Sequence, residues 1–270
     1  MAYEWIIDGL AQTWDDIDRV TRHLTSEQFA AATACPGWSV QDVLSHLVGF
    51  ELMLSGEPVP DVEVGSPAYV KNPIGEINEK FVVARRERDG REVVEEFRDV
   101  CARSLANLRA KPDEEWDVVG WSPEGDAPFW RFMETRTLDS WIHLQDIRDA
   151  LLEPQDDHGA GEEIVVNRFE AALPYVIGRR AKAPDGTTVR VNLIGRLARV
   201  VSVEVVDGRA RATEAISGVP TVEITTPVAL FWRRMAGRIS AEAFLAASAT
   251  DAAGDRALAR AIADGMSIMI

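Results

Sequence analysis

The spacing of apolar residues divides the chain into two parts of different character. Up to about residue 152, apolar residues recur three or four positions apart, as they do on the buried face of an amphipathic helix. This pattern predicts four principal helices, at 3–24, 40–55, 92–110 and 129–152, with a further helical run at 74–88. Because no segment here has the alternation of a convincing strand, a helical bundle is the simplest way to bury these stripes.

The second principal helix has a clear predicted start. Ser39 is a good N-cap residue, and Asp42 three positions later forms a near capping box. The helix should end before Gly56, since residues 55–73 contain four prolines and little periodicity. We expect a long loop there.

The second part begins after a polar, turn-forming segment at 153–159, which predicts a linker. A helix is expected at 162–179, and further helices near 228–235 and 255–263. Between them lie β-rich runs at 189–194, 200–206 and 221–225, with hairpin turns at Asp185-Gly186 and Asp207-Gly208. The prediction is therefore an α+β protein of two domains, a helical bundle at 1–155 and a small α+β domain at 160–270.

Charge and composition narrow the possible partners. A net charge of −15 argues against binding to nucleic acid and against docking on an anionic membrane. No apolar run approaches the ~20 residues that span a bilayer, and the start lacks the features of a signal peptide. Cys35 and Cys101 are too few for a disulfide framework and are expected to be thiols. We expect a cytoplasmic protein.

Two of the four histidines are candidates for chemistry. His23 and His158 are expected at the surface, whereas His46 lies mid-helix at the edge of an apolar stripe. His143 follows Asp139 by four residues, so both side chains lie on one helix face, roughly 6 Å apart at Cβ. His46 is either a satisfied core residue or a ligand, and the Asp139/His143 pair either a surface pair or part of a metal site.

If these three residues meet, they form a particular kind of site. Two histidines and one carboxylate leave a coordination position of a divalent ion open, as in catalytic rather than structural sites. A thiol bound at that position is deprotonated.

Two segments carry a resemblance to a known family. Residues 36–47 read PGWSVQDVLSHL and residues 136–148 read RTLDSWIHLQDIR. They resemble the second-helix and fourth-helix signatures of the mycothiol-dependent maleylpyruvate isomerase family, which has a DinB-like four-helix bundle. The tail segments LPYVIGR, PDGT, VVDGRA and FWRRMAGR resemble the sterol-carrier-like C-terminal domain of that family.

The resemblance implies a bundle-bound divalent ion, usually zinc, on His46, Asp139 and His143. The characterised isomerase has Glu where this chain has Asp139, so the ion would have to sit closer to that helix. The implied cosubstrate is mycothiol, the low-molecular-weight thiol of actinobacteria, whose metal-bound thiolate adds to a small electrophile or displaces a leaving group. In the isomerase, addition, rotation and elimination convert cis into trans.

Two further residues have expected supporting roles. The resemblance implies an arginine of the C-terminal domain for substrate carboxylates, and Arg238 is the candidate, although it could equally cap a helix end. Asp146 either orients a metal ligand or pairs with the tail domain. Trp38, Trp121, Trp130 and Trp141 either line a pocket above the ion or pack in the core, and Cys35 is expected to be inert because no basic partner is near it in sequence.

The sequence thus predicts a mycothiol-dependent isomerase or thiol S-transferase. One alternative is a metal-dependent hydrolase, in which the ion activates water. Another is a non-catalytic protein whose tail domain binds an apolar ligand.

Overall fold

The computed structural model describes residues 2–154 and 159–269. The chain divides into two compact units, Met1–Ile164 and Val165–Ile270. The predicted linker and domain boundary fall largely on residues 155–158, outside the described residues, and the domain limits stay a prediction.

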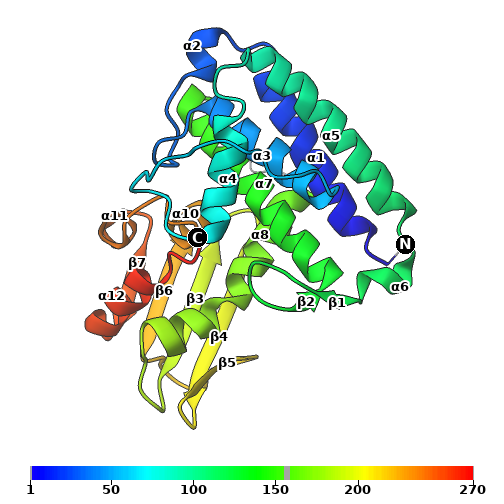
Figure 1. The fold of residues 1–270 in the computed structure, drawn as a ribbon. Helices are drawn as coiled ribbons and strands as arrows, with labels where there is room; N and C mark the ends of the chain where they lie inside the picture. Colours follow the sequence, from blue (N-terminus) through cyan, green and yellow to red (C-terminus); the bar gives the residue numbers. More distant parts are fainter. Residues whose placement is uncertain (1, 155–158, 270) are drawn as a thin grey trace. The chain divides into compact units, whose positions relative to one another are not determined.

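The first unit is helical, and its four long helices confirm the four predicted ones. Helices α1 and α5 run side by side (Figure 1), α1 also packs against α7, and α3 packs against α4, α5 and α7. The elements of this unit are α1 Glu4–Thr21, α2 Ser26–Phe29, α3 Val40–Leu54, α4 Pro73–Val83, α5 Gly90–Ala110, α6 Asp113–Trp116, β1 Val119–Gly120, β2 Ala127–Pro128 and α7 Phe129–Leu151.

Helix α3 forms where the capping signal predicted it. The hydroxyl of Ser39 accepts a hydrogen bond from the backbone N–H of Asp42, whose carboxylate accepts one from the N–H of Ser39. Val40, Val43 and Leu44 are completely buried, each stabilising the fold by roughly 1.5–3 kcal/mol. Because α4, α5 and α7 all pack against it, α3 is buried on more than one face.

The first unit differs from the prediction in its connections. Helix α4 ends at Val83 rather than near Arg88, because the chain then turns and the amide of Gln41 donates hydrogen bonds to the carbonyls of Arg85 and Arg88. The short helices α2 and α6 were not predicted, nor was the antiparallel pair of β1 and β2, whose strands have two residues each. Such short elements have no measurable periodicity.

The second unit contains a five-stranded sheet in the order β5-β4-β3-β6-β7. Strands β3 and β6 are parallel, and the other neighbours are antiparallel. Buried and partly exposed residues alternate along β3 and β6, and α10 and α12 pack against the sheet. The elements are β3 Thr188–Ile194, β4 Arg199–Val206, β5 Arg209–Thr213, β6 Val222–Pro227, α10 Val228–Met235, α11 Ala241–Ala246, β7 Asp251–Gly254 and α12 Arg256–Gly265.

The helix predicted at 162–179 is interrupted. It consists of α8 Ala160–Ala171, the single turn α9 Leu173–Tyr175 and the π-helical turn η1 Val176–Arg180, since Pro174 lacks the N–H that would continue the helix. The predicted hairpin at Asp185-Gly186 was wrong: the N–H of Gly186 bonds to the carbonyl of Val205, and only β3 follows.

The other hairpin turn is confirmed, because Asp207 and Gly208 join the antiparallel pair β4 and β5. Helix α11 and strands β5 and β7 were not predicted. The prediction of an α+β protein is nevertheless confirmed. Among the described residues, no helix combines the length and apolar character that crossing a membrane requires.

Candidate metal centre

The structure brings together the three residues singled out in the sequence. Nε2 of His46 lies 3.2 Å from Oδ2 of Asp139, and Nε2 of His143 lies 3.5 Å from Oδ1 of the same carboxylate. The two imidazole centroids are 5.0 Å apart. One nitrogen from each ring and one carboxylate oxygen lie within 4.8 Å of one another.

Two elements supply this cluster. Asp139 and His143 are one turn apart on α7, so helix geometry alone aligns them. His46 comes from α3, and the packing of α3 against α7 brings it to the same point. The two imidazoles are only 5% and 7% exposed, whereas the Asp139 carboxylate is 28% exposed, so the cluster opens on the carboxylate side.

The donor set fits one divalent ion. Ligand atoms about 2.0–2.2 Å from a tetrahedral zinc are about 3.3–3.6 Å apart, and each histidine Nε2 lies near this distance from one oxygen of Asp139, Oδ2 for His46 and Oδ1 for His143. Nδ1 of His46 is buried with no hydrogen-bond partner among the described residues. A proton on Nε2 of His143 as well as on Nδ1 makes that ring cationic in a buried site, and a bound cation would replace the Nε2 proton.

The charges of the cluster are strongly coupled. Burial acts to raise the pKa of Asp139, but the positive charge of His46 and His143 and their hydrogen bonds bring it well below its ordinary value. Burial acts to lower the pKa of His143, but the Asp139 carboxylate and further contacts raise it well above its ordinary value. The site therefore favours a negative carboxylate surrounded by positive charge.

The carboxylate of Asp146 contacts the other ring nitrogen of His143. Oδ2 of Asp146 lies 3.1 Å from Nδ1 of His143, on the ring edge opposite Asp139. With a metal bound, this contact would hold the remaining ring proton on Nδ1 and leave the Nε2 lone pair for the ligand bond. Cys35, which was expected to be inert, lies here too, with Sγ 3.4 Å from Oδ2 of Asp146 and 3.8 Å from Nδ1 of His143.

The ring of Trp38 covers one side of the cluster. Its centroid lies 5.2 Å from that of His46 and 6.3 Å from that of His143. Trp38 Nε1 donates a hydrogen bond to Glu79 of α4. Among the four tryptophans considered in the sequence, Trp38 thus lies against the candidate ligands, and Trp141 is buried in the helical unit.

A buried cation lies one turn before Asp139. Arg136 forms an ion pair with Glu51, and its guanidinium lies 4.9 Å from the centroid of the Phe50 ring. Burial lowers the pKa of Arg136 to about 10, against the opposing attraction of Asp139. The side chain is therefore charged at neutral pH and adds positive potential behind the cluster.

Arg238 lies in the second unit, just after α10, and is partly buried. Its guanidinium donates a hydrogen bond of 3.0 Å to the carbonyl of Ala236. This is the helix-capping contact that the sequence left open as the alternative to a substrate-binding role.

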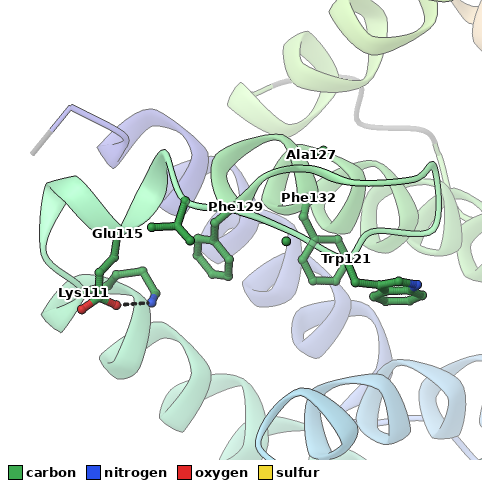
Figure 2. A pocket seen from close by; sticks show the side chains of 8 residues that line it. Lys111, Glu115, Trp121, Ala127, Phe129 and Phe132 are labelled. Carbon is green, nitrogen blue, oxygen red and sulfur yellow. Dashed lines mark hydrogen bonds and ion pairs between the residues drawn. The ribbon is translucent and has the colours of Figure 1, made fainter.

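The first unit also has an aromatic pocket of about 380 Å³ (Figure 2). Trp121 forms one wall, with its ring edge-on to Phe132 at 6.1 Å between centroids, and Lys111 pairs with Glu115 at the other end. The lining residues are Lys111, Glu115, Val118, Gly120, Trp121, Ala127, Phe129 and Phe132. None of them is a candidate ligand, so Trp121 lines a pocket other than the one expected above the ion.

Sequence reasoning missed Glu79 and undervalued Cys35. Both lie far along the chain from the residues they contact, 41 positions from Trp38 and 108 from His143 respectively. The only local signal was that Cys35 and Trp38 belong to the segment that precedes α3.

Fold and site together define a class of protein: an α+β protein whose helical unit has a two-histidine, one-carboxylate cluster suited to one divalent ion. A family model described as "Mycothiol maleylpyruvate isomerase N-terminal domain" matches residues 10–148, slightly more than half of the chain. The chain belongs to this family, as its sequence motifs predicted. The matched range includes all three residues of the cluster.

Solved structures share the fold over nearly the whole chain. A crystal structure of the mycothiol-dependent maleylpyruvate isomerase is 14% identical, with a TM-score of 0.61 and coverage of 94% of this chain and 93% of that one. A histidine-to-alanine mutant of the isomerase, also 14% identical, has a TM-score of 0.55 and covers 88% and 90%. At this identity the likeness establishes the fold alone. No curated protein matches the sequence.

Proposed function

We propose that this protein is a metal-dependent and mycothiol-dependent enzyme of the maleylpyruvate isomerase type, an isomerase or a thiol S-transferase. The observation that carries the proposal is the convergence of His46, Asp139 and His143 from two helices on one point. Membership of the family supports the choice of mycothiol as cosubstrate. The second substrate is a small electrophile.

His46 and His143 would hold the ion, which we propose to be zinc, through Nε2, and Asp139 through a carboxylate oxygen. When bound, such an ion lowers the pKa of a coordinated thiol, so that the thiolate is present at neutral pH. Asp146 keeps the proton of His143 on Nδ1, and Asp139 faces the accessible side, where thiol and electrophile would enter.

Trp38 would limit the space above the imidazoles and keep water from part of the site. Arg238 stays a candidate for binding substrate carboxylates, and Asp146 for orienting a ligand. Replacing Arg238 by alanine is expected to raise KM for a dicarboxylate substrate more than it lowers kcat, provided that this side chain binds the carboxylates.

Metal content tests the core of the proposal. Protein loaded with zinc and then dialysed should retain about one equivalent, as three protein ligands suffice for a catalytic zinc site. In a Cys35→Ser background, which removes the thiol beside His143, His46→Ala should lose it, while His23→Ala, which changes an exposed histidine of the same unit, should not. Failure of the wild type to retain zinc would refute the metal site and favour the binding-protein alternative.

Activity with and without thiol separates the enzyme classes. Maleylpyruvate and a chloroaromatic electrophile are each offered to the zinc-loaded protein with mycothiol, and an ester is offered without it. Turnover of either electrophile only in the presence of mycothiol supports the proposal. Ester hydrolysis that needs the metal but no thiol would instead make the protein a hydrolase.

A further inference from the structure

A second group of possible metal ligands lies on the far side of His143. It consists of Sγ of Cys35, Nδ1 of His143 and Oδ2 of Asp146, three atoms within 4.8 Å of one another. Cys35 lies in the turn before α3, and the other two lie three residues apart on α7. All three belong to the first unit.

The separations are within a few tenths of an ångström of the edges of a tetrahedral site. Sγ lies 3.8 Å from Nδ1 and 3.4 Å from Oδ2, and Nδ1 lies 3.1 Å from Oδ2. With zinc–sulfur bonds of about 2.3 Å and zinc–nitrogen or zinc–oxygen bonds of about 2.0–2.2 Å, the edges to sulfur should be about 3.5–3.7 Å and the nitrogen–oxygen edge about 3.3–3.6 Å. Shifts of a few tenths of an ångström would complete three ligand bonds.

We propose that Cys35, His143 and Asp146 form a second metal site, selective for thiophilic ions such as Zn²⁺ and Cd²⁺, that shares His143 with the first cluster. The thiolate is the soft ligand that the first cluster lacks, and soft ligands favour such ions over Mg²⁺ or Mn²⁺. Cys35 is only half-buried, so an ion reaches its sulfur without unfolding of the bundle.

The shared histidine makes the two sites compete. A neutral imidazole has one lone pair and one N–H, so it cannot bind an ion at Nδ1 and another at Nε2. Ion binding at the second site releases the thiol proton of Cys35 to solvent and moves the ring proton of His143 from Nδ1 to Nε2. His143 is then lost as a ligand of the first cluster. An excess of a thiophilic ion should therefore cause the first cluster to release its metal.

Cadmium titration tests the site directly. Metal-free protein is titrated with Cd²⁺ alone, and the ultraviolet thiolate-to-cadmium charge-transfer absorption is recorded. The band should appear in the wild type and disappear in Cys35→Ser. Cys101→Ser is the matched control and should keep the band, because Cys101 is buried on α5, is 5% exposed and belongs to neither ligand group. A band that survives in Cys35→Ser would overturn the proposal, as would its absence from the wild type.

His46→Ala separates this proposal from the proposed function. It removes a ligand of the first cluster only, so the Cd²⁺ band should remain. If His46→Ala abolishes the band as Cys35→Ser does, Cys35 is a ligand of the first ion and the second site is refuted. Circular dichroism of each variant shows that the fold is intact.

The competition has its own readout. Zinc-loaded protein treated with excess Cd²⁺ should release zinc to a chromogenic chelator faster in the wild type than in Cys35→Ser. Equal release from both proteins would show that Cd²⁺ acts at the first cluster, against the proposal. Since Cys35→Ser should still retain zinc at the first cluster, failure of one site leaves the other testable.

Discussion

The indole N–H of Trp38 donates a hydrogen bond of 2.8 Å to Oε2 of Glu79, which joins the turn before α3 to helix α4. Glu79 is 1% exposed, and its other oxygen accepts hydrogen bonds from the hydroxyl of Tyr69 and from Arg86. This buried carboxylate therefore holds the ring that lies against His46.

Replacing Glu79 by glutamine should destabilise the protein by about 2–3 kcal/mol. The amide keeps the shape but loses the negative charge, and its NH₂ group would face donors on Tyr69 or Arg86. Urea unfolding followed by tryptophan fluorescence measures the loss. Glu76→Gln, an exposed change in the first turn of the same helix, should cost only a few tenths of a kcal/mol. Equal effects would contradict the assigned role of Glu79.

Two glycine-to-alanine changes should differ clearly in their effect on stability. A Cβ on Gly49 of α3 would lie 2.3 Å from Cβ of Phe81 on α4, so Gly49→Ala should destabilise the protein by about 1–3 kcal/mol. A Cβ on Gly75 meets nothing closer than 3.6 Å, and Gly75→Ala should be neutral or stabilise by up to about 1 kcal/mol. Thermal unfolding distinguishes the two variants, and a stabilised Gly49→Ala would contradict the close packing of α3 against α4.

Replacing Asp146 by asparagine should weaken zinc binding at the first cluster by about 10–100-fold, because His143 loses the carboxylate that fixes its tautomer and ring orientation. Competition with a chromogenic chelator measures the affinity. Asp149→Asn is the matched control, since it changes an exposed carboxylate on the same helix and should leave the affinity unchanged. An unaltered affinity in Asp146→Asn would remove Asp146 from the metal site.

The ion pairs of Glu96 predict an acid-dependent loss of stability. Burial acts to raise the pKa of Glu96, but Arg85 and Arg88 lower it below the ordinary value of 4.5. A carboxyl with a lower pKa in the folded state adds stability above its unfolded pKa, and that stability is lost as the pH falls through the folded value. The contribution is thus complete at neutral pH and is lost on acidification below the ordinary value of 4.5, as the pH falls through the lowered pKa of the folded state.

Glu96→Gln should therefore cost about 1 kcal/mol at pH 7 and much less at pH 3. The free energy of unfolding, measured in urea between these pH values, should converge for the two proteins on acidification. Glu95→Gln, at an exposed position of the same helix, should leave the pH dependence unchanged. Parallel curves for Glu96→Gln and the wild type would contradict the prediction.

Long-range pairing accounts for most of the elements that the sequence did not predict. Strand β5 has mostly exposed residues, and β7 is only four residues long, so neither has a clear alternation of apolar side chains. Each exists because a neighbouring strand offers hydrogen bonds, β4 in one case and β6 in the other. The interruption at Pro174 was visible in the sequence, but it was outweighed by the apolar periodicity around it.

The sequence by itself determined the long helices, the start of α3 and the alignment of Asp139 with His143, because helical periodicity, capping and four-residue spacing act between near neighbours. Only the tertiary structure decided that His46 meets this pair across 93 positions, that Glu79 holds Trp38, and that Cys35 lies beside His143. These contacts depend on how α3, α4 and α7 pack, and packing is set by the whole buried surface rather than by any local pattern.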